Sequence, residues 1–174
     1  MIQNQYIDNP EDKIARIKLF AFDVDGVLTN GEIIYTDKGE EIKIFNAKDG
    51  QGIANLVKNN YITAVITARE SFIVDKRAND LNIKEVYQGI KNKFKVIEIL
   101  MQKYNLELSE IAYTGDDLPD ICVLEKVGLA FCPYDAVEEV KQICHFISSK
   151  EGGKGAVREI TDLLIKNKKT VELF

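Results

Sequence analysis

Two aspartates separated by one residue follow an apolar run near the start of the chain. Asp23 and Asp25 come directly after residues 18–22, which have the composition of a buried strand. Like charges so close together repel each other, and an apolar surround makes their ionisation costly. A bound cation is the simplest way to compensate these charges. The pair therefore predicts a metal site, and carboxylate oxygens suit a hard ion such as Mg²⁺.

Three further polar groups follow other predicted strands. Thr67 follows the second strand, Lys93 lies in the loop or first helical turn after the third, and Asp116 follows the fourth. A lone threonine or lysine at a strand end is usually a cap or a solvated charge. Ligands bind at the carboxyl ends of parallel strands, and all these residues are predicted to lie at that one edge. Their shared placement is the evidence for a site.

This set of residue types suits the hydrolysis of a phosphate monoester. Asp23 and Asp116 could hold Mg²⁺, which neutralises phosphate charge. The other oxygen of Asp23 could attack phosphorus and form an aspartyl-phosphate, which splits one difficult step into two. Asp25 could protonate the leaving alkoxide and later activate water. Thr67 and Lys93 are the natural donors to the phosphoryl oxygens.

The apolar periodicity predicts an α/β fold. Short apolar segments with the character of strands alternate with helical patterns, and this order indicates βαβ units with a parallel sheet covered on both faces. The predicted strands are 18–22, 61–66, 85–87, 111–114, 128–131 and 144–147, and the predicted helices are 49–59, 70–81, 92–104, 118–126, 135–141 and 155–167.

One segment, residues 31–46, interrupts this alternation. Two short strands flank the turn signal at 37–39, which predicts a hairpin that projects beyond the sheet, over the acidic site. Apolar side chains lie on both faces of this ribbon. Because a two-stranded ribbon is barely stable alone, we expect a neighbouring subunit to cover it.

Composition bounds the remaining possibilities. The chain has 174 residues, which suits one domain over 1–174, and 45% of them are hydrophobic. A net charge of −5 disfavours nucleic-acid binding. No apolar run approaches the ~18 residues of a membrane helix, and no signal peptide is evident. The three cysteines are odd in number and lack metal-ligand spacing, so we expect reduced thiols in a cytoplasmic protein.

The acidic and strand-end segments also resemble the four motifs of the haloacid dehalogenase (HAD) superfamily of phosphatases. Further segments resemble one family within it, the 3-deoxy-D-manno-octulosonate 8-phosphate phosphatases, over about residues 13–167. The resembling segments are 23–29, 65–67, Lys93 and 115–120 for the superfamily, and 49–53, 76–81, 87–89, 111–120 and 152–159 for the family.

The resemblance implies a Rossmann-like three-layer core, the HAD-like fold, with a minimal cap. It implies a homotetramer built through a hairpin placed like residues 31–46. It implies a small phosphorylated sugar acid as substrate, in a step toward lipopolysaccharide. Residues 1–12 look like an N-terminal extension outside the family pattern.

The resemblance also implies residue roles at the metal. Asp23 resembles the nucleophile and metal ligand, and Asp25 resembles the acid/base, binding metal through its backbone carbonyl. Asp116 resembles the remaining protein ligand of Mg²⁺, with Asp117 beside it as a supporting group. Asp120, three residues further on, has the position of a residue that caps a helix.

Other residues resemble the family's substrate-binding groups. Thr67 and Lys93 resemble the phosphate binders, and Arg69 would face the sugar-acid side of the pocket. Arg77 or Arg158 could reach the same pocket, across a subunit interface.

Two details concern substrate choice. Family members that act on a nine-carbon ulosonate 9-phosphate tend to carry Glu at the position of Arg69, so Arg69 favours the eight-carbon substrate, although Glu70 is adjacent. Ala68 stands where the family usually has Gly, which could tighten this loop.

Three alternatives stay open. One is the same chemistry on the nine-carbon phosphate or another sugar phosphate. A second is a phosphoacceptor receiver domain, although the segment after the third strand lacks the aspartate that such domains phosphorylate. A third is a scaffold without catalysis. The glycine-rich segment 152–155 is either a helix entry or an anion site formed by backbone amides.

Overall fold

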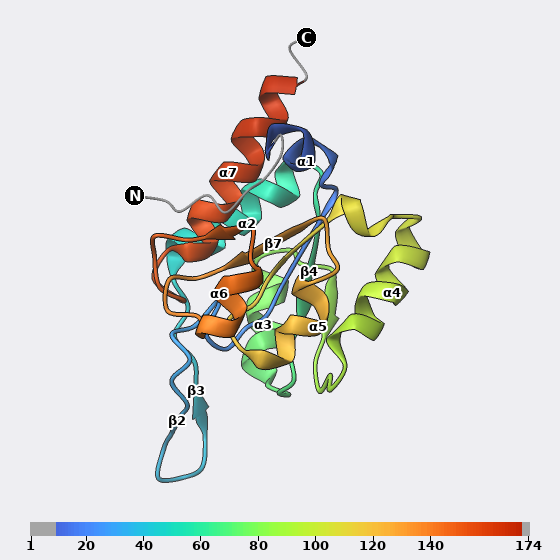
Figure 1. Ribbon diagram of the computed structural model, residues 1–174. Helices are drawn as coiled ribbons and strands as arrows, with labels where there is room; N and C mark the ends of the chain where they lie inside the picture. The colour runs from blue at the N-terminus through green and yellow to red at the C-terminus, as the bar shows by residue number, and fades with distance from the viewer. Residues whose placement is uncertain (1–9, 172–174) are drawn as a thin grey trace.

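Six parallel strands form the central sheet of the structure, a computed structural model that describes residues 10–171 (Figure 1). The strand order is β5-β4-β1-β6-β7-β8, so the chain begins in the middle and extends the sheet to both sides. The strands are β1 (Leu19–Phe22), β4 (Ile62–Ile66), β5 (Glu85–Tyr87), β6 (Ile111–Thr114), β7 (Leu129–Cys132) and β8 (Phe146–Ile147). This arrangement confirms the predicted α/β fold with a parallel sheet.

Helices cover both faces of this sheet, because its strands are apolar on both sides. In β1, Phe20 and Phe22 pack on one face, while Leu19 and Ala21 pack on the other. The first face carries α1 (Pro10–Arg16), α2 (Ala47–Lys58), α3 (Phe72–Asp80) and α7 (Ala156–Val171). The second face carries α4 (Lys93–Tyr104), α5 (Ile121–Leu124) and α6 (Glu138–Ile143).

The predicted hairpin is present between β1 and α2. Its strands β2 (Ile34–Tyr35) and β3 (Glu41–Ile42) pair antiparallel, with Ile34 opposite Ile42. Figure 1 shows the ribbon extending away from the sheet, at the end of the molecule opposite α1. Its apolar side chains Ile33 and Ile44 are 53% and 64% exposed, so this subunit does not cover them.

Two elements differ from the prediction. The predicted helix 118–126 is a 3₁₀ turn, Leu118–Asp120, followed by the short helix α5, because Asp117 and Asp120 form a capping box around Pro119. Helix α1 was not predicted, and it lies partly within the expected extension 1–12. Residues 1–9 lie outside the described residues. No helix in the described part of the chain is long and apolar enough to cross a membrane.

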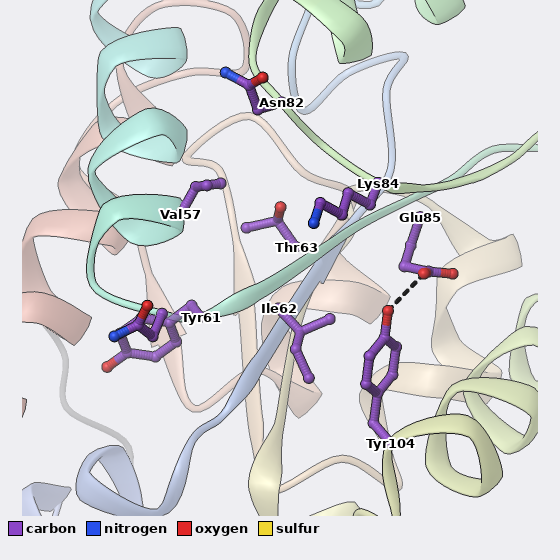
Figure 2. A pocket seen from close by; sticks show the side chains of 9 residues that line it. Val57, Tyr61, Ile62, Thr63, Asn82, Lys84, Glu85 and Tyr104 are labelled. Carbon is purple, nitrogen blue, oxygen red and sulfur yellow. Dashed lines mark hydrogen bonds between the residues drawn. The ribbon is translucent and has the colours of Figure 1, made fainter.

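A cavity of about 290 Å³ lies at the amino ends of β4 and β5, away from the carboxyl ends where the predicted site lies (Figure 2). Glu85 lines it and accepts hydrogen bonds from Lys103 Nζ (2.6 Å), Tyr104 Oη (2.6 Å) and Tyr87 Oη (2.9 Å). Burial opposes ionisation of Glu85, but these donors outweigh it and lower its pKa below the ordinary 4.5. The carboxylate thus ties the last turn of α4 to the edge strand.

Replacing this carboxylate should weaken the fold in a pH-dependent way. We expect Glu85→Gln to lower the free energy of unfolding by about 1–3 kcal/mol at neutral pH. Because the folded pKa is depressed, the stabilisation is complete above the unfolded pKa and disappears as pH falls through the folded pKa. Urea unfolding at neutral pH and below about pH 4 measures both values.

The matched control is Glu98→Gln on the exposed side of the same helix, which should change stability little at either pH. Equal effects of the two substitutions would show that the buried carboxylate does not anchor α4.

Candidate active site

The loop after β1 carries the two predicted aspartates. The Asp23 N–H donates to Thr114 O (3.0 Å), which continues the β1–β6 ladder, and the chain then turns. Gly26 has φ +82°, and a Cβ there would lie 1.9 Å from Asp116 Oδ2. Only glycine allows this conformation and this approach. The turn therefore brings the Asp23 loop against the loop after β6.

Lys93 lies at the centre of the site, at the first residue of α4. Its side chain is 1% exposed, and Nζ is 2.7 Å from Asp23 Oδ2 and 2.7 Å from Asp120 Oδ1. Burial favours the neutral amine, but the charges of Asp23 and Asp120 outweigh it and raise the pKa of Lys93. A charged ammonium is thus held between two carboxylates.

Asp120 does more than the expected helix cap. Its Oδ2 accepts the backbone N–H groups of Asp116 (3.1 Å) and Asp117 (3.3 Å), which is the predicted capping role. Its Oδ1 also accepts from Lys93 and from Tyr113 Oη (2.7 Å). Asp120 is fully buried. Lys93 is 27 residues away in the sequence, so a local capping pattern does not predict this contact.

Asp116 is the least satisfied carboxylate of the site. Its Oδ1 is buried without a hydrogen-bond partner. Burial, with the charges of Asp120 and Asp23, raises the pKa of Asp116 to about 8. Burial also raises the pKa of Asp23 to about 6, although Lys93 opposes this shift. The protein alone therefore does not compensate the negative charge gathered here.

These residues fit a hard divalent cation. Asp23, Asp116 and Asp120 can each offer one oxygen within 4.8 Å of the others. Both oxygens of Asp120 already accept hydrogen bonds, whereas Asp116 keeps an unpaired one. Asp116 is therefore the carboxylate with an oxygen free for a cation, Asp23 lies beside it with Val24 N–H and Lys93 as its partners, and Asp120 holds Lys93. Oxygen donors of this kind suit Mg²⁺.

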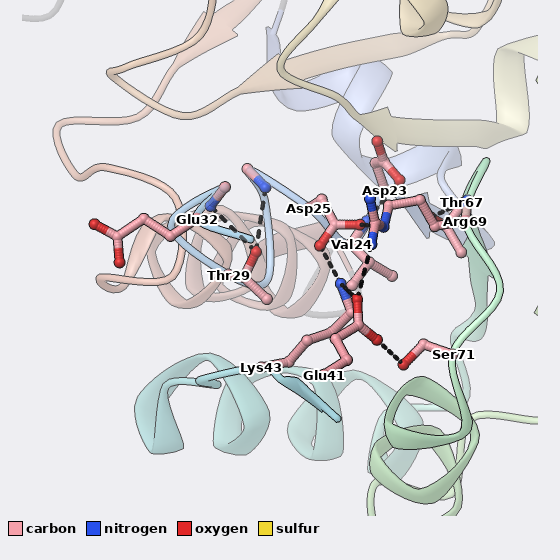
Figure 3. Close-up of polar contacts among 12 residues, drawn as sticks. Asp23, Val24, Asp25, Thr29, Glu32, Glu41, Lys43, Thr67, Arg69 and Ser71 are labelled. Carbon is pink, nitrogen blue, oxygen red and sulfur yellow. Dashed lines mark hydrogen bonds and ion pairs between the residues drawn. The ribbon is translucent and has the colours of Figure 1, made fainter. Parts of the chain in front are cut away.

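The Asp25 side chain belongs to a second group of charges (Figure 3). Its carboxylate contacts the Lys43 ammonium, and its Oδ2 lies 3.8 Å from Arg69 Nε. Thr67 is buried at the end of β4, and its Oγ1 accepts from the Arg69 N–H (3.4 Å). Asp25, Thr67 and Arg69 thus lie together, as the sequence predicts.

Three other predicted residues make their contacts elsewhere among the described residues. Asp117 is exposed, and its side chain accepts from the Leu118 N–H (2.8 Å). The Arg158 guanidinium pairs with Asp162 (2.8 Å) one turn along α7.

Arg77 packs over the Phe45 ring, 5.5 Å from its centroid, and donates to Asn46 O (3.3 Å). Within one subunit, therefore, neither Arg77 nor Arg158 contacts the acidic residues described above.

The glycine-rich segment 152–155 supports the site through packing. Its four backbone N–H groups already have acceptors within the chain: Asp135 Oδ1, Val27 O, Glu151 O and Asp49 Oδ2. A Cβ on Gly152 would lie 1.8 Å from Gly26 O. The segment therefore packs directly on the Asp25 loop. Its backbone amides donate to acceptors within the chain, so they are not free to bind an anion.

Sequence reasoning missed two hairpin residues that reach the site, Glu41 and Lys43. They alternate with Ile42 and Ile44, so they share one face of the ribbon. This alternation was the available signal, but the sequence does not tell which face meets the Asp25 loop.

Comparison with known proteins agrees with this geometry. Residues 78–160 match a family described as haloacid dehalogenase-like hydrolase. The 3-deoxy-D-manno-octulosonate 8-phosphate phosphatase of Yersinia pestis is 37% identical over 158 residues, which are 91% of this chain and 84% of that protein. The corresponding protein of Salmonella typhi is 40% identical over 153 residues, covering 88% and 81%.

Solved structures agree as well. The crystal structure of the Moraxella catarrhalis phosphatase of the same name, in complex with magnesium ion, phosphate ion and KDO, has a TM-score of 0.92 and 38% identity. The match covers 97% of each chain. The chain described above therefore belongs to the 3-deoxy-D-manno-octulosonate 8-phosphate phosphatase family of haloacid dehalogenase-like hydrolases.

Proposed function

We propose that the protein hydrolyses 3-deoxy-D-manno-octulosonate 8-phosphate to the free sugar acid and phosphate, with Mg²⁺ and an aspartyl-phosphate intermediate. The observation that carries this proposal is the Asp23–Lys93–Asp120 arrangement beside the unpaired oxygen of Asp116. The relatives with this name, and the solved relative with magnesium, phosphate and KDO, support the choice of substrate class.

Asp23 and Asp116, with the backbone carbonyl of Asp25, would hold the metal. When bound, Mg²⁺ would neutralise part of the negative charge of the phosphate. Of the protein groups, the Val24 N–H binds Asp23 Oδ1 (2.7 Å) and Lys93 binds Oδ2 (2.7 Å), so the nucleophilic carboxylate has one orientation. Orientation of this kind lowers the entropic part of the barrier.

The remaining residues would act on the phosphoryl group and the leaving group. Asp23 attacks phosphorus, while Lys93 and Thr67 donate to the phosphoryl oxygens. Asp25, which must begin in its protonated form, first gives its proton to the sugar oxygen as it leaves and then takes one from the water that hydrolyses the aspartyl-phosphate. Each proton thus passes through one carboxyl group, which returns to its starting state.

Substrate selection would depend on arginines around this centre. Arg69 lies next to Asp25 and favours the eight-carbon acid over the nine-carbon one. Arg77 and Arg158 would meet the substrate only if a neighbouring subunit presents them. Asp117 would act through its neighbour Asp116. Ala68 is exposed in the loop before Arg69.

We also propose a cytoplasmic homotetramer in lipopolysaccharide precursor synthesis. The exposed apolar residues of the hairpin support the assembly, since they need a covering surface. The free state of Cys122, Cys132 and Cys144 agrees with a reducing compartment.

The direct test is phosphate release from 3-deoxy-D-manno-octulosonate 8-phosphate with Mg²⁺ and with a chelator. We expect metal-dependent turnover that prefers this compound to a nine-carbon ulosonate 9-phosphate and to other sugar phosphates. A preference for another phosphate would reject the substrate, and no turnover of any compound would reject the enzyme.

Two substitutions separate the catalytic roles. Asp23→Asn should lower kcat by more than about a thousandfold, because an amide is a poor nucleophile. Asp25→Asn should lower kcat by about 10²–10⁴-fold, since it removes the proton transfer. Asp37→Asn, in the exposed hairpin turn, is the control and should match the wild type. Normal turnover by Asp23→Asn would exclude the covalent mechanism.

Mg²⁺ binding should strengthen as pH rises. Without metal, the pKa of Asp116 is about 8 and that of Asp23 about 6, so protons compete with the cation below these values. Affinity should increase about tenfold per pH unit between about 6 and 8 and level off above. Calorimetric titration with MgCl₂ at several pH values measures this slope, and a constant affinity would contradict the assignment.

Assembly should depend on the hairpin. Ile44→Asp places a charge on an apolar side chain that is 64% exposed in the single subunit, so it should shift the mass in solution from tetramer toward smaller species. Ile99→Asp, at a 51% exposed position on α4, is the control. Size-exclusion chromatography with light scattering measures the mass of each variant in solution. An Ile44→Asp variant with unchanged mass would rule out this surface as the interface.

A further inference from the structure

We propose that the hairpin is a working part of the active site, in which Lys43 positions Asp25, and Glu41 positions Arg69. The inference rests on the proposed function, because it assigns these residues to support the acid/base and the substrate-facing arginine. Both positioning residues come from β3 or the residue just after it, which lies in a ribbon that otherwise extends away from the sheet (Figures 1 and 3).

Lys43 is a buried cation that contacts the Asp25 side chain. Its side chain is only 3% exposed, and its ammonium contacts the Asp25 carboxylate and lies 3.4 Å from Glu41 Oε1. A buried ammonium is costly unless it is paired, so these two carboxylates determine where it lies. The same contact restrains Asp25, since Arg69 Nε at 3.8 Å is too distant for a good hydrogen bond. Lys43 is therefore the main tether of the Asp25 side chain.

Glu41 binds Arg69 and Ser71. Its Oε1 accepts from Arg69 Nη2 (3.0 Å) and its Oε2 from Ser71 Oγ (2.6 Å). The hydrogen bond from Ser71, with Arg69 and Lys43, lowers the pKa of Glu41, so the carboxylate is ionised at neutral pH. Glu41 thus joins the hairpin to two residues of the loop between β4 and α3, Arg69 and Ser71.

Tyr35 also binds Arg69. It lies directly opposite Glu41 in the β2–β3 ladder, and its Oη accepts from the same Arg69 Nη2 (3.0 Å). Two residues from one cross-strand pair therefore hold one guanidinium nitrogen. Arg69 Nε is buried without a hydrogen-bond partner and lies 3.8 Å from Asp25 Oδ2, so the hydrogen bonds from Nη2 to the hairpin are what hold the guanidinium.

The two residues should act on different kinetic constants. Loss of Lys43 frees the Asp25 carboxylate, which takes part in chemistry, so kcat should fall while KM changes little. Loss of the Glu41 charge frees Arg69, which contacts substrate, so KM should rise while kcat changes little. A merely structural role would lower stability, or would lower kcat and raise KM in both variants alike.

The first test compares Lys43→Met with Lys38→Met. Lys38 is on the same hairpin but exposed in its turn. Lys43→Met should lower kcat for the sugar acid phosphate by about 10–100-fold, as expected for a misplaced catalytic group, and Lys38→Met should have no effect. Lys43→Arg keeps a cation and should recover most of the lost kcat. Wild-type kcat in Lys43→Met, or no recovery in a folded Lys43→Arg, would overturn the proposal.

The second test compares Glu41→Gln with its exposed neighbour, Glu40→Gln. Glu41→Gln should raise KM for the sugar acid phosphate by about tenfold, and Glu40→Gln should not. An unchanged KM in Glu41→Gln, or a fall in kcat alone, would overturn the role of Glu41.

An aryl phosphate such as p-nitrophenyl phosphate separates this inference from the proposed substrate. Its hydrolysis still requires Asp25 to activate water, so Lys43→Met should slow it, whereas Glu41→Gln should not. If the wild type hydrolyses only the aryl phosphate, the proposed substrate fails and the Lys43 test is still decided. If Lys43→Met hydrolyses both compounds at the wild-type rate, the positioning inference fails.

Discussion

The buried ammonium of Lys93 holds together two carboxylates that would otherwise repel each other at the edge of the sheet. It lies 2.7 Å from Asp23 and 2.7 Å from Asp120, with almost no contact with solvent. Removing one partner of such a group leaves an uncompensated buried charge, which is strongly destabilising. Asp116 adds a third carboxylate with an unpaired oxygen. The site therefore lacks positive charge, and this deficit is what makes it able to attract a divalent cation and then a phosphate.

The parallel sheet makes this concentration of charge possible. Asp23 follows β1, Asp116 follows the adjacent β6, and Lys93 begins the helix after β5, so topology alone brings them to one edge. Close packing then fixes their geometry. Gly26 has no side chain, so Asp116 can lie directly against it, and Gly152 packs on the Gly26 carbonyl. The helices on the two faces do not contribute the three carboxylates, but α4 contributes Lys93 as its first residue.

Much of this could be predicted from the sequence, because strands with apolar faces and polar ends follow short-range rules. The six strands were predicted within one or two residues, and their shared edge follows from parallel pairing. The contact of Asp120 with Lys93 could not be predicted, since the local capping pattern already explained that residue. Lys43 and Glu41 were missed because the side of the ribbon that meets the site depends on tertiary packing. Arg77 and Arg158 were expected in the pocket, and their contacts within one subunit lie elsewhere.

The proposed covalent mechanism requires that Asp23 becomes phosphorylated during turnover. The most direct measurement is rapid acid quenching of the enzyme with Mg²⁺ and 3-deoxy-D-manno-octulosonate 8-phosphate, followed by peptide mass analysis. We expect one added phosphoryl group on the peptide that contains Asp23, present during turnover and absent when a chelator is added. Phosphorylation of a different residue during turnover would contradict this mechanism, because the Lys93–Asp23 arrangement would then not hold the nucleophile.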